Sequence, residues 1–154
     1  MPKQEIRPLV LIADPDTEYT VLVARQLEWA GYGIITTGDG AEALELIEER
    51  RPDAVVLEAM MPGMSGYALT RRLRAGEDTR LLPIVMISTR AGKLDRDFAF
   101  TVGADDYVRK PFRCADIVAR LALLAPAGPH PIVAATRRPS RAGVPVIRTA
   151  AALG

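Results

Sequence analysis

The stretch PLVLIADPD, Pro8–Asp16, contains the pattern from which the fold can be predicted. Its apolar run, Leu9–Ala13, lies between a proline and an aspartate, which is typical of a strand buried on both faces of a sheet. Helix-like sequence follows from Thr17 to Ala30 and ends at Gly31, because glycine is common just after the last turn of a helix. The chain therefore begins with a strand followed by a helix.

The same strand–helix unit recurs along the chain. Further strands are predicted at 32–37, 54–58, 84–88 and 107–109, and further helices at 41–51, 67–75, 94–102 and 116–124. Strict alternation predicts parallel strands joined by right-handed crossovers, with helices on both faces of the sheet. Such units fit a flavodoxin-like, doubly wound α/β fold, (βα)5, with strand order 2-1-3-4-5, in which ligands bind outside the carboxyl ends of the strands.

The two ends of the chain differ in charge. All 19 acidic residues precede Pro126, together with 16 of the 20 basic residues, so this part has a net charge of −3 and the remainder a net charge of +4. Residues 126–154 are rich in proline, alanine and arginine, and their apolar runs are too short to form a core. We predict a folded domain at 8–125 and a flexible tail at 126–154. The tail arginines lack accompanying aromatic residues, which argues against direct nucleic-acid binding.

The sequence also bears on the location of the protein. No apolar run approaches the roughly 18 residues that a membrane-spanning helix needs, and the N-terminal segment has no apolar signal-peptide core. Cys114 is the only cysteine, so an intramolecular disulfide is excluded. We expect a cytoplasmic protein without membrane contact.

Polar residues follow four of the predicted strands at the edge where ligands are expected. Asp14 and Asp16 follow the first strand, Glu58 ends the third, Ser88 ends the fourth, and Lys110 follows the fifth. Carboxylates are suitable ligands for Mg²⁺, whereas lysine and hydroxyl groups bind phosphate oxygens. The sequence therefore predicts a site that could handle a phosphoryl group and a divalent cation.

Four segments of the sequence carry a family resemblance: VLIADPD, DAVVLEAMMPGMSG, PIVMIST and GADDYVRKPF. They resemble the signature blocks of bacterial response-regulator receiver domains (CheY-like), and the resemblance covers about residues 8–124. In that family an aspartate ending the third strand accepts phosphate from a kinase, and an acidic pair after the first strand holds Mg²⁺. The resemblance implies a protein-binding module rather than an enzyme, with Ser88, Lys110 and the aromatic Tyr107 as the residues that respond to phosphate.

Two positions depart from the family pattern. Glu58 stands where the phosphoaccepting aspartate belongs, and Pro15 stands where the second acid of the pair belongs. The extra methylene of glutamate moves its carboxylate by about 1.5 Å, and a displacement of that size can cost on the order of 100-fold in rate. The family-type Mg²⁺ ligands that remain are Asp14, Glu58 and the carbonyl of Met60, so we expect no cofactor or only weak Mg²⁺ binding. Asp16 either replaces the missing ligand or lies in the first turn of the helix.

The leading hypothesis is a stand-alone pseudo-receiver in two-component-type signal transduction, which contacts a histidine kinase or another signalling protein without being phosphorylated. Glu58 would then imitate phosphate by reaching toward Lys110 and Ser88, or would only neutralise Lys110. One alternative is a working phosphoacceptor in a phosphorelay. Another is a flavodoxin-like cofactor binder, which is disfavoured because the Asp-Pro-Asp loop after the first strand offers no phosphate cradle.

Four charged residues also resemble those through which receivers pair. This resemblance implies a homodimer through the face of the fourth helix, fifth strand and fifth helix. The residues are Asp105, Asp106, Asp116 and Arg120.

Overall fold

The computed structural model describes residues 7–90 and 92–126. Within them, five parallel strands form one sheet in the order β2-β1-β3-β4-β5, so the predicted flavodoxin-like fold is confirmed. The strands are β1 (Leu9–Ala13), β2 (Gly33–Thr37), β3 (Ala54–Glu58), β4 (Ile84–Ser88) and β5 (Asp106–Arg109). The helices are α1 (Thr17–Trp29), α2 (Gly40–Arg50), α3 (Gly66–Ala75), α4 (Lys93–Val102) and α5 (Cys114–Leu124). Apart from Pro126, the predicted tail at 126–154 lies outside the described residues.

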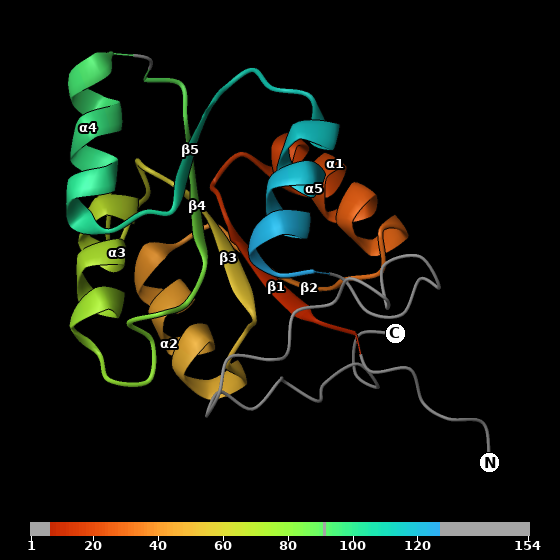
Figure 1. The fold of residues 1–154 in the computed structure, drawn as a ribbon, viewed down its shortest axis with the longest axis horizontal. Coiled ribbons are helices and arrows are strands. Elements are labelled where there is room, and N and C mark those ends of the chain that lie inside the picture. The colour runs from red at the N-terminus through yellow and green to blue at the C-terminus, as the bar shows by residue number, and fades with distance from the viewer. Residues whose placement is uncertain (1–6, 91, 127–154) are drawn as a thin grey trace.

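The helices form two layers around the sheet. Helices α1 and α5 lie on one face, and α2, α3 and α4 lie on the other (Figure 1). None of the helices in the described part of the chain combines the length and the apolar character that crossing a bilayer requires. Helices α1 to α4 each connect two parallel strands, so all five strands end at the same edge.

Capping side chains explain why two helices begin earlier than predicted. Asp39 accepts hydrogen bonds from the backbone of Ala41 and Glu42, so α2 begins at Gly40. Ser65 accepts one from the backbone of Ala68, so α3 begins at Gly66. Such caps satisfy backbone N–H groups that have no partner within the helix. Periodicity of apolar residues alone places these boundaries one residue too late.

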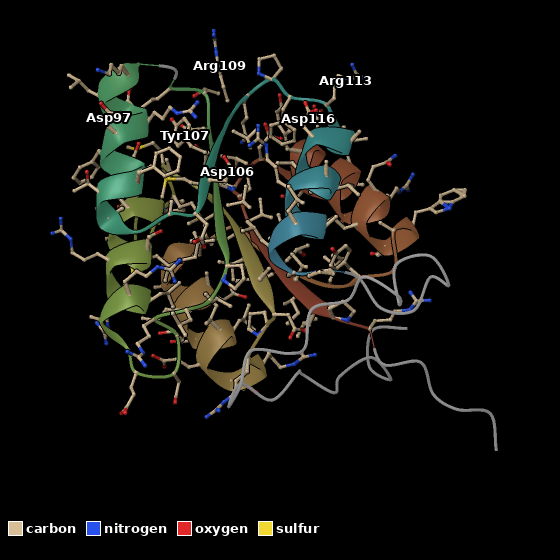
Figure 2. All side chains as sticks on the ribbon, in the orientation of Figure 1. Asp97, Asp106, Tyr107, Arg109, Arg113 and Asp116 are labelled. Carbon is tan, nitrogen blue, oxygen red and sulfur yellow. The ribbon has the colours of Figure 1, made fainter. Side chains whose placement is uncertain are left out.

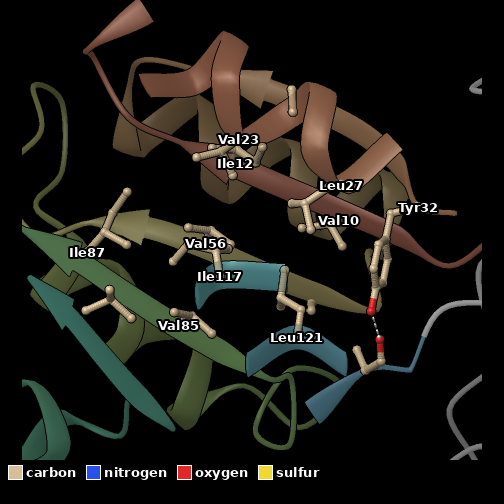
Figure 3. Close-up of a cluster of buried hydrophobic side chains, with 14 residues drawn as sticks. Val10, Ile12, Val23, Leu27, Tyr32, Val56, Val85, Ile87, Ile117 and Leu121 are labelled. Atoms are coloured by element: carbon tan, nitrogen blue, oxygen red, sulfur yellow. Dashed lines mark hydrogen bonds between the residues drawn. The ribbon is translucent and has the colours of Figure 1, made fainter. Parts of the chain in front are cut away.

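Alternate strand residues fill two separate cores. Val10, Ile12 and Val56 point toward α1 and α5 and pack with apolar residues such as Leu27 and Leu121 of those helices (Figure 3). The residues between them, including Leu11 and Leu57, pack against α2, α3 and α4. Burial on both faces confirms the interpretation of the apolar runs as central parallel strands.

Tyr32 joins the end of α5 to the start of β2. Its side chain is 1% exposed, and its hydroxyl donates a hydrogen bond to the carbonyl of Ala125 at 2.6 Å (Figure 3). We predict that Tyr32→Phe lowers the free energy of unfolding by about 1–2 kcal/mol, because a buried acceptor loses its donor. Urea denaturation measures this. Tyr19→Phe is the matched control, since the Tyr19 hydroxyl makes no hydrogen bond within the described residues. Equal stability of the two variants would contradict the prediction.

Candidate functional site

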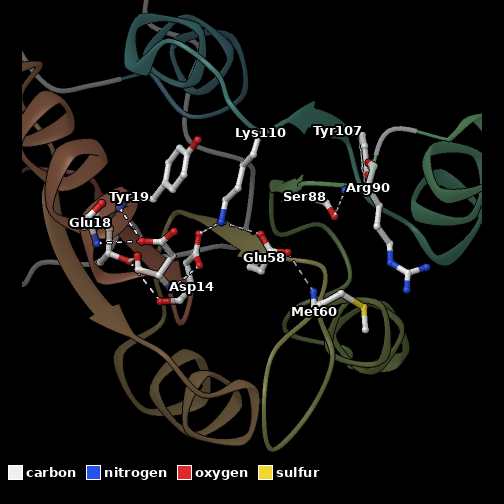
Figure 4. A network of polar contacts seen from close by, with 11 residues as sticks. Asp14, Glu18, Tyr19, Glu58, Met60, Ser88, Arg90, Tyr107 and Lys110 are labelled. Atoms are coloured by element: carbon white, nitrogen blue, oxygen red, sulfur yellow. Dashed lines mark hydrogen bonds and ion pairs between the residues drawn. The ribbon is translucent and has the colours of Figure 1, made fainter.

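Three charged side chains meet at the carboxyl edge of the sheet. Asp14 follows β1, Glu58 ends β3, and Lys110 follows β5 (Figure 4). The Lys110 Nζ lies 2.5 Å from Asp14 Oδ2 and 2.9 Å from Glu58 Oε2. The three residues are only 2%, 6% and 6% exposed in chain order. We call these residues the ion cluster.

The backbone around Glu58 fixes its position. The peptide N–H of Gly66 donates to the carbonyl of Ala59 at 2.8 Å, which closes the loop after β3. A Cβ atom at position 66 would lie 2.3 Å from the carbonyl oxygen of Glu58, so only glycine allows this approach. The loop therefore returns directly beside the glutamate.

Both carboxylates divide their oxygens between the backbone and the lysine. Asp14 Oδ1 accepts a hydrogen bond from the backbone of Asp16 at 2.8 Å, and Glu58 Oε1 accepts one from the backbone of Met60 at 3.3 Å. Within the described residues, the remaining oxygens, Oδ2 and Oε2, are buried with the Lys110 ammonium as their polar contact. The ion cluster thus has two acids for one base.

Burial and pairing act in opposite directions on the ionisation of the ion cluster. Burial raises the pKa of Glu58 above its usual value, and the hydrogen bond with Lys110 offsets part of that rise. Burial alone would lower the pKa of Lys110, but its hydrogen bonds with Asp14 and Glu58 outweigh that effect and raise the pKa. The lysine is therefore held as an ammonium ion, whereas burial disfavours the charged form of Glu58.

Ser88 and Tyr107 bond to the segment after β4 rather than to the ion cluster. The fully buried Ser88 accepts a hydrogen bond at Oγ from the backbone of Arg90 at 3.0 Å. The Tyr107 side chain is also buried, and its hydroxyl donates to the carbonyl of Arg90. The structure thus brings Glu58 to Lys110, whereas the hydrogen bonds of the described residues do not include one between Glu58 and Ser88.

The acidic side chains at this edge contact other groups of the described chain. The Asp16 side chain is the N-cap of α1 and accepts hydrogen bonds from the backbone of Glu18 and Tyr19, so it lies directly before the first turn in which it was predicted. No three His, Cys, Asp or Glu side chains gather in a way that could hold a metal ion in residues 7–90 and 92–126. Mg²⁺ demands near-octahedral oxygen ligands, and the Lys110 ammonium already contacts one oxygen each of Asp14 and Glu58.

Tyr19 also lies at the site, although it was not predicted from the sequence. Its ring centroid lies 4.6 Å from Lys110 Nζ and 5.3 Å from the ring of Phe112. The available signal was an aromatic residue in the first turn of the helix that follows Asp14. Pairing with Lys110 depends on side-chain direction, which sequence spacing alone does not give.

The four residues predicted for the pairing face have partners within the chain. Asp106 forms an ion pair with Arg120, and Asp116 accepts a hydrogen bond from the backbone of Arg113 at the start of α5. Figure 2 shows Asp106 and Asp116 near β5 and α5. Asp105 instead accepts from the backbone of Ile84 at 2.8 Å and pairs with Arg74 of α3. Asp105 thus lies apart from the other three residues, and Asp106, Asp116 and Arg120 remain together near β5 and α5.

The chain is similar in sequence and in fold to known proteins. The sequence profile described as "Response regulator receiver domain" matches residues 10–122. The chain belongs to this family. The receiver domain is 40% identical over 115 residues to the response regulator MprA of Mycobacterium sp. (strain KMS), a match that covers 75% of this chain and 49% of MprA. The chain thus spans about half the length of this curated relative.

Solved structures confirm the fold of the receiver domain. A putative response regulator from Chloroflexus aurantiacus J-10-fl superposes with a TM-score of 0.69 at 32% identity, covering 76% of this chain and 96% of that one. The receiver domain of the sensor histidine kinase PA1611 from Pseudomonas aeruginosa PAO1 superposes with a TM-score of 0.70 at 28% identity, with the same coverage. That structure has a magnesium ion coordinated in its active-site cleft. The present chain is accordingly a receiver domain of two-component signalling, a signalling module by family.

Proposed function

We propose that this receiver domain signals through protein–protein contacts that do not require phosphorylation, with Glu58 as a permanent acid at the phosphoacceptor position. The observation that carries the proposal is the buried contact of 2.9 Å between Glu58 Oε2 and Lys110 Nζ. A phosphoryl donor would have to share the Glu58 carboxylate with the groups that already contact it. Here one oxygen of Glu58 is paired with the ammonium and the other accepts from the backbone of Met60.

The oxygen ligands available to a divalent cation also support this proposal. Phosphoryl transfer depends almost entirely on positioning and on charge stabilisation by a divalent cation. Pro15 offers no side-chain oxygen, and the donors left are Asp14, Glu58 and the Met60 carbonyl. Because Lys110 already neutralises one of the two carboxylates, we expect Mg²⁺ to bind weakly or not at all.

The ion cluster would imitate phosphate only in part. A carboxylate carries one negative charge, whereas a phosphoryl group carries about −1.5 to −2 at neutral pH. Glu58 nevertheless places a fixed negative charge beside Lys110, and the buried Tyr107 anchors the segment after β4. We infer an active-like arrangement that is held constantly rather than switched.

The proposed partner is a histidine kinase or another signalling protein of a bacterial cytoplasm, bound by the domain at 8–125. The face formed by α4, β5 and α5 is the proposed surface for a homodimer, in which Asp106, Asp116 and Arg120 would contact the second copy. Direct contact with nucleic acid is not part of the proposed role of this domain.

Affinity capture from a bacterial lysate, followed by titration of the captured protein, tests the function. We expect the wild type to bind its partner equally well with and without acetyl phosphate and Mg²⁺. Glu58→Gln should weaken binding by on the order of tenfold, a typical coupling between a switch and a partner site. Glu45→Gln is the matched control, because Glu45 is an exposed acid on α2. Binding that appears only with acetyl phosphate would overturn the proposal.

A further inference from the structure

We propose that Tyr19 is a positioning residue of the ion cluster, whose ring holds the Lys110 ammonium against Asp14 and Glu58. This inference deepens the proposed function and rests on it in one respect: Lys110 serves as a fixed internal counter-ion rather than as a reader of phosphate. The ring belongs to α1, so this helix also contributes a side chain to the site.

The contacts of the ammonium support this role. A lysine ammonium has three N–H donors, and two carboxylate oxygens lie within 2.5 and 2.9 Å of Nζ. The Tyr19 ring centroid lies 4.6 Å from the same nitrogen. Cations within about 6 Å of a ring centroid are attracted by its electron-rich face. The ammonium is therefore surrounded by groups of its own chain.

Tyr19 is held in this place from two directions. Its backbone N–H donates to Asp16 Oδ1 at 3.3 Å, at the start of α1. On the other side its ring packs against Phe112, which follows Lys110 by two residues and contacts the core. Figure 4 shows the ring beside the end of the lysine side chain, next to Asp14. A ring fixed in this way restricts the lysine.

The direction of this restriction matters for function. In Figure 4 Tyr19 and Asp14 lie on one side of the ammonium, and Glu58 lies between it and Ser88. Pro15 cannot supply a second acid near Asp14. The electron-rich ring attracts the ammonium toward that same side. It therefore keeps Lys110 away from Ser88, the residue with which Lys110 would have to share a phosphate.

Competitive acetylation of the lysines tests the inference in the full chain. The sequence has three lysines, Lys3, Lys93 and Lys110, and the exposed Lys93 is the internal standard. Acetic anhydride at limiting concentration and peptide mass spectrometry give the labelling rate of Lys110 relative to Lys93. Tyr19→Leu should raise this ratio by about fivefold to 30-fold, the range that cation–π energies of about 1–2 kcal/mol imply. Tyr19→Phe, which keeps the ring face, should leave the ratio as in the wild type.

Two results would overturn the inference. Equal ratios for Tyr19→Leu and the wild type would show that the ring does not hold the ammonium. An increased ratio in Tyr19→Phe would show that the hydroxyl, rather than the ring face, is responsible. Thermal melting confirms that each variant is folded at the labelling temperature. Phe112→Leu removes the ring that packs against Tyr19 but keeps Tyr19 itself, so it should raise the labelling ratio less than Tyr19→Leu does. The measurement uses no phosphodonor, so its failure is distinct from failure of the proposed function.

Discussion

Replacing Pro15 and Glu58 together by aspartate should give a domain that acquires phosphate from acetyl phosphate and Mg²⁺ on the order of 100-fold faster than the wild type. The double variant restores a carboxylate of the right length and an additional oxygen ligand for the metal. Each of these changes improves the position of the groups that react with the phosphoryl donor. A displacement of such groups by 1 Å can lower the reaction rate by about 100-fold. Intact-protein mass spectrometry follows the added phosphoryl group over time.

The single variants serve as controls for this prediction. Glu58→Asp alone still lacks the second acid, and Pro15→Asp alone still has the longer side chain, so both should stay well below the double variant. Addition of Mg²⁺ and beryllofluoride to the double variant should shift the amide signals at the ends of β1 and β3 in a saturable way. Phosphorylation of the wild type at the rate of the double variant would refute the proposed loss of phosphoacceptor function.

Lys110→Met should lower the free energy of unfolding by about 3–5 kcal/mol, the usual cost of breaking a buried ion pair by removing one partner. Methionine has a similar length but leaves two buried carboxylates without a counter-ion. Urea denaturation measures the loss. Lys93→Met is the matched control, because Lys93 is exposed and its replacement should change stability by no more than about 0.5 kcal/mol.

A neutral version of the ion cluster separates charge from packing. Asp14→Asn and Glu58→Gln added to Lys110→Met remove all three charges while keeping the side chains at similar size. Replacing a whole buried ionic group by neutral residues is often neutral for stability, so we expect this triple variant to be more stable than Lys110→Met alone. If the triple variant were less stable, packing around the lysine stem, rather than unpaired charge, would account for the loss.

Much of the fold could be predicted because apolar runs such as Leu9–Ala13 are buried on both faces and alternate with helical sequence. The approach of Asp14, Glu58 and Lys110 was equally predictable, since parallel strands end at one edge of the sheet. Helix starts were less accurate, because they depend on side-chain caps such as Ser65. Local hydrogen bonds, rather than periodicity, decide these boundaries.

Other features of the site depend on contacts that spacing does not encode. Tyr19 and Lys110 are far apart in sequence, and their contact requires a particular direction of both side chains. Asp105 was grouped with the pairing face, yet its carboxylate holds the start of β4 and pairs with Arg74. Such tertiary partners compete for a charged residue, and sequence alone does not reveal which partner it contacts.

The hydrogen bond between the Tyr32 hydroxyl and the Ala125 carbonyl fixes the place at which the chain leaves the domain after α5. Helix α5 starts beside Lys110 and ends at this bond, at the opposite edge of the sheet from the ion cluster. Its 11 residues span about 16 Å at 1.5 Å per residue. The described chain therefore leaves the domain one length of α5 away from the charged groups, at the opposite edge of the sheet.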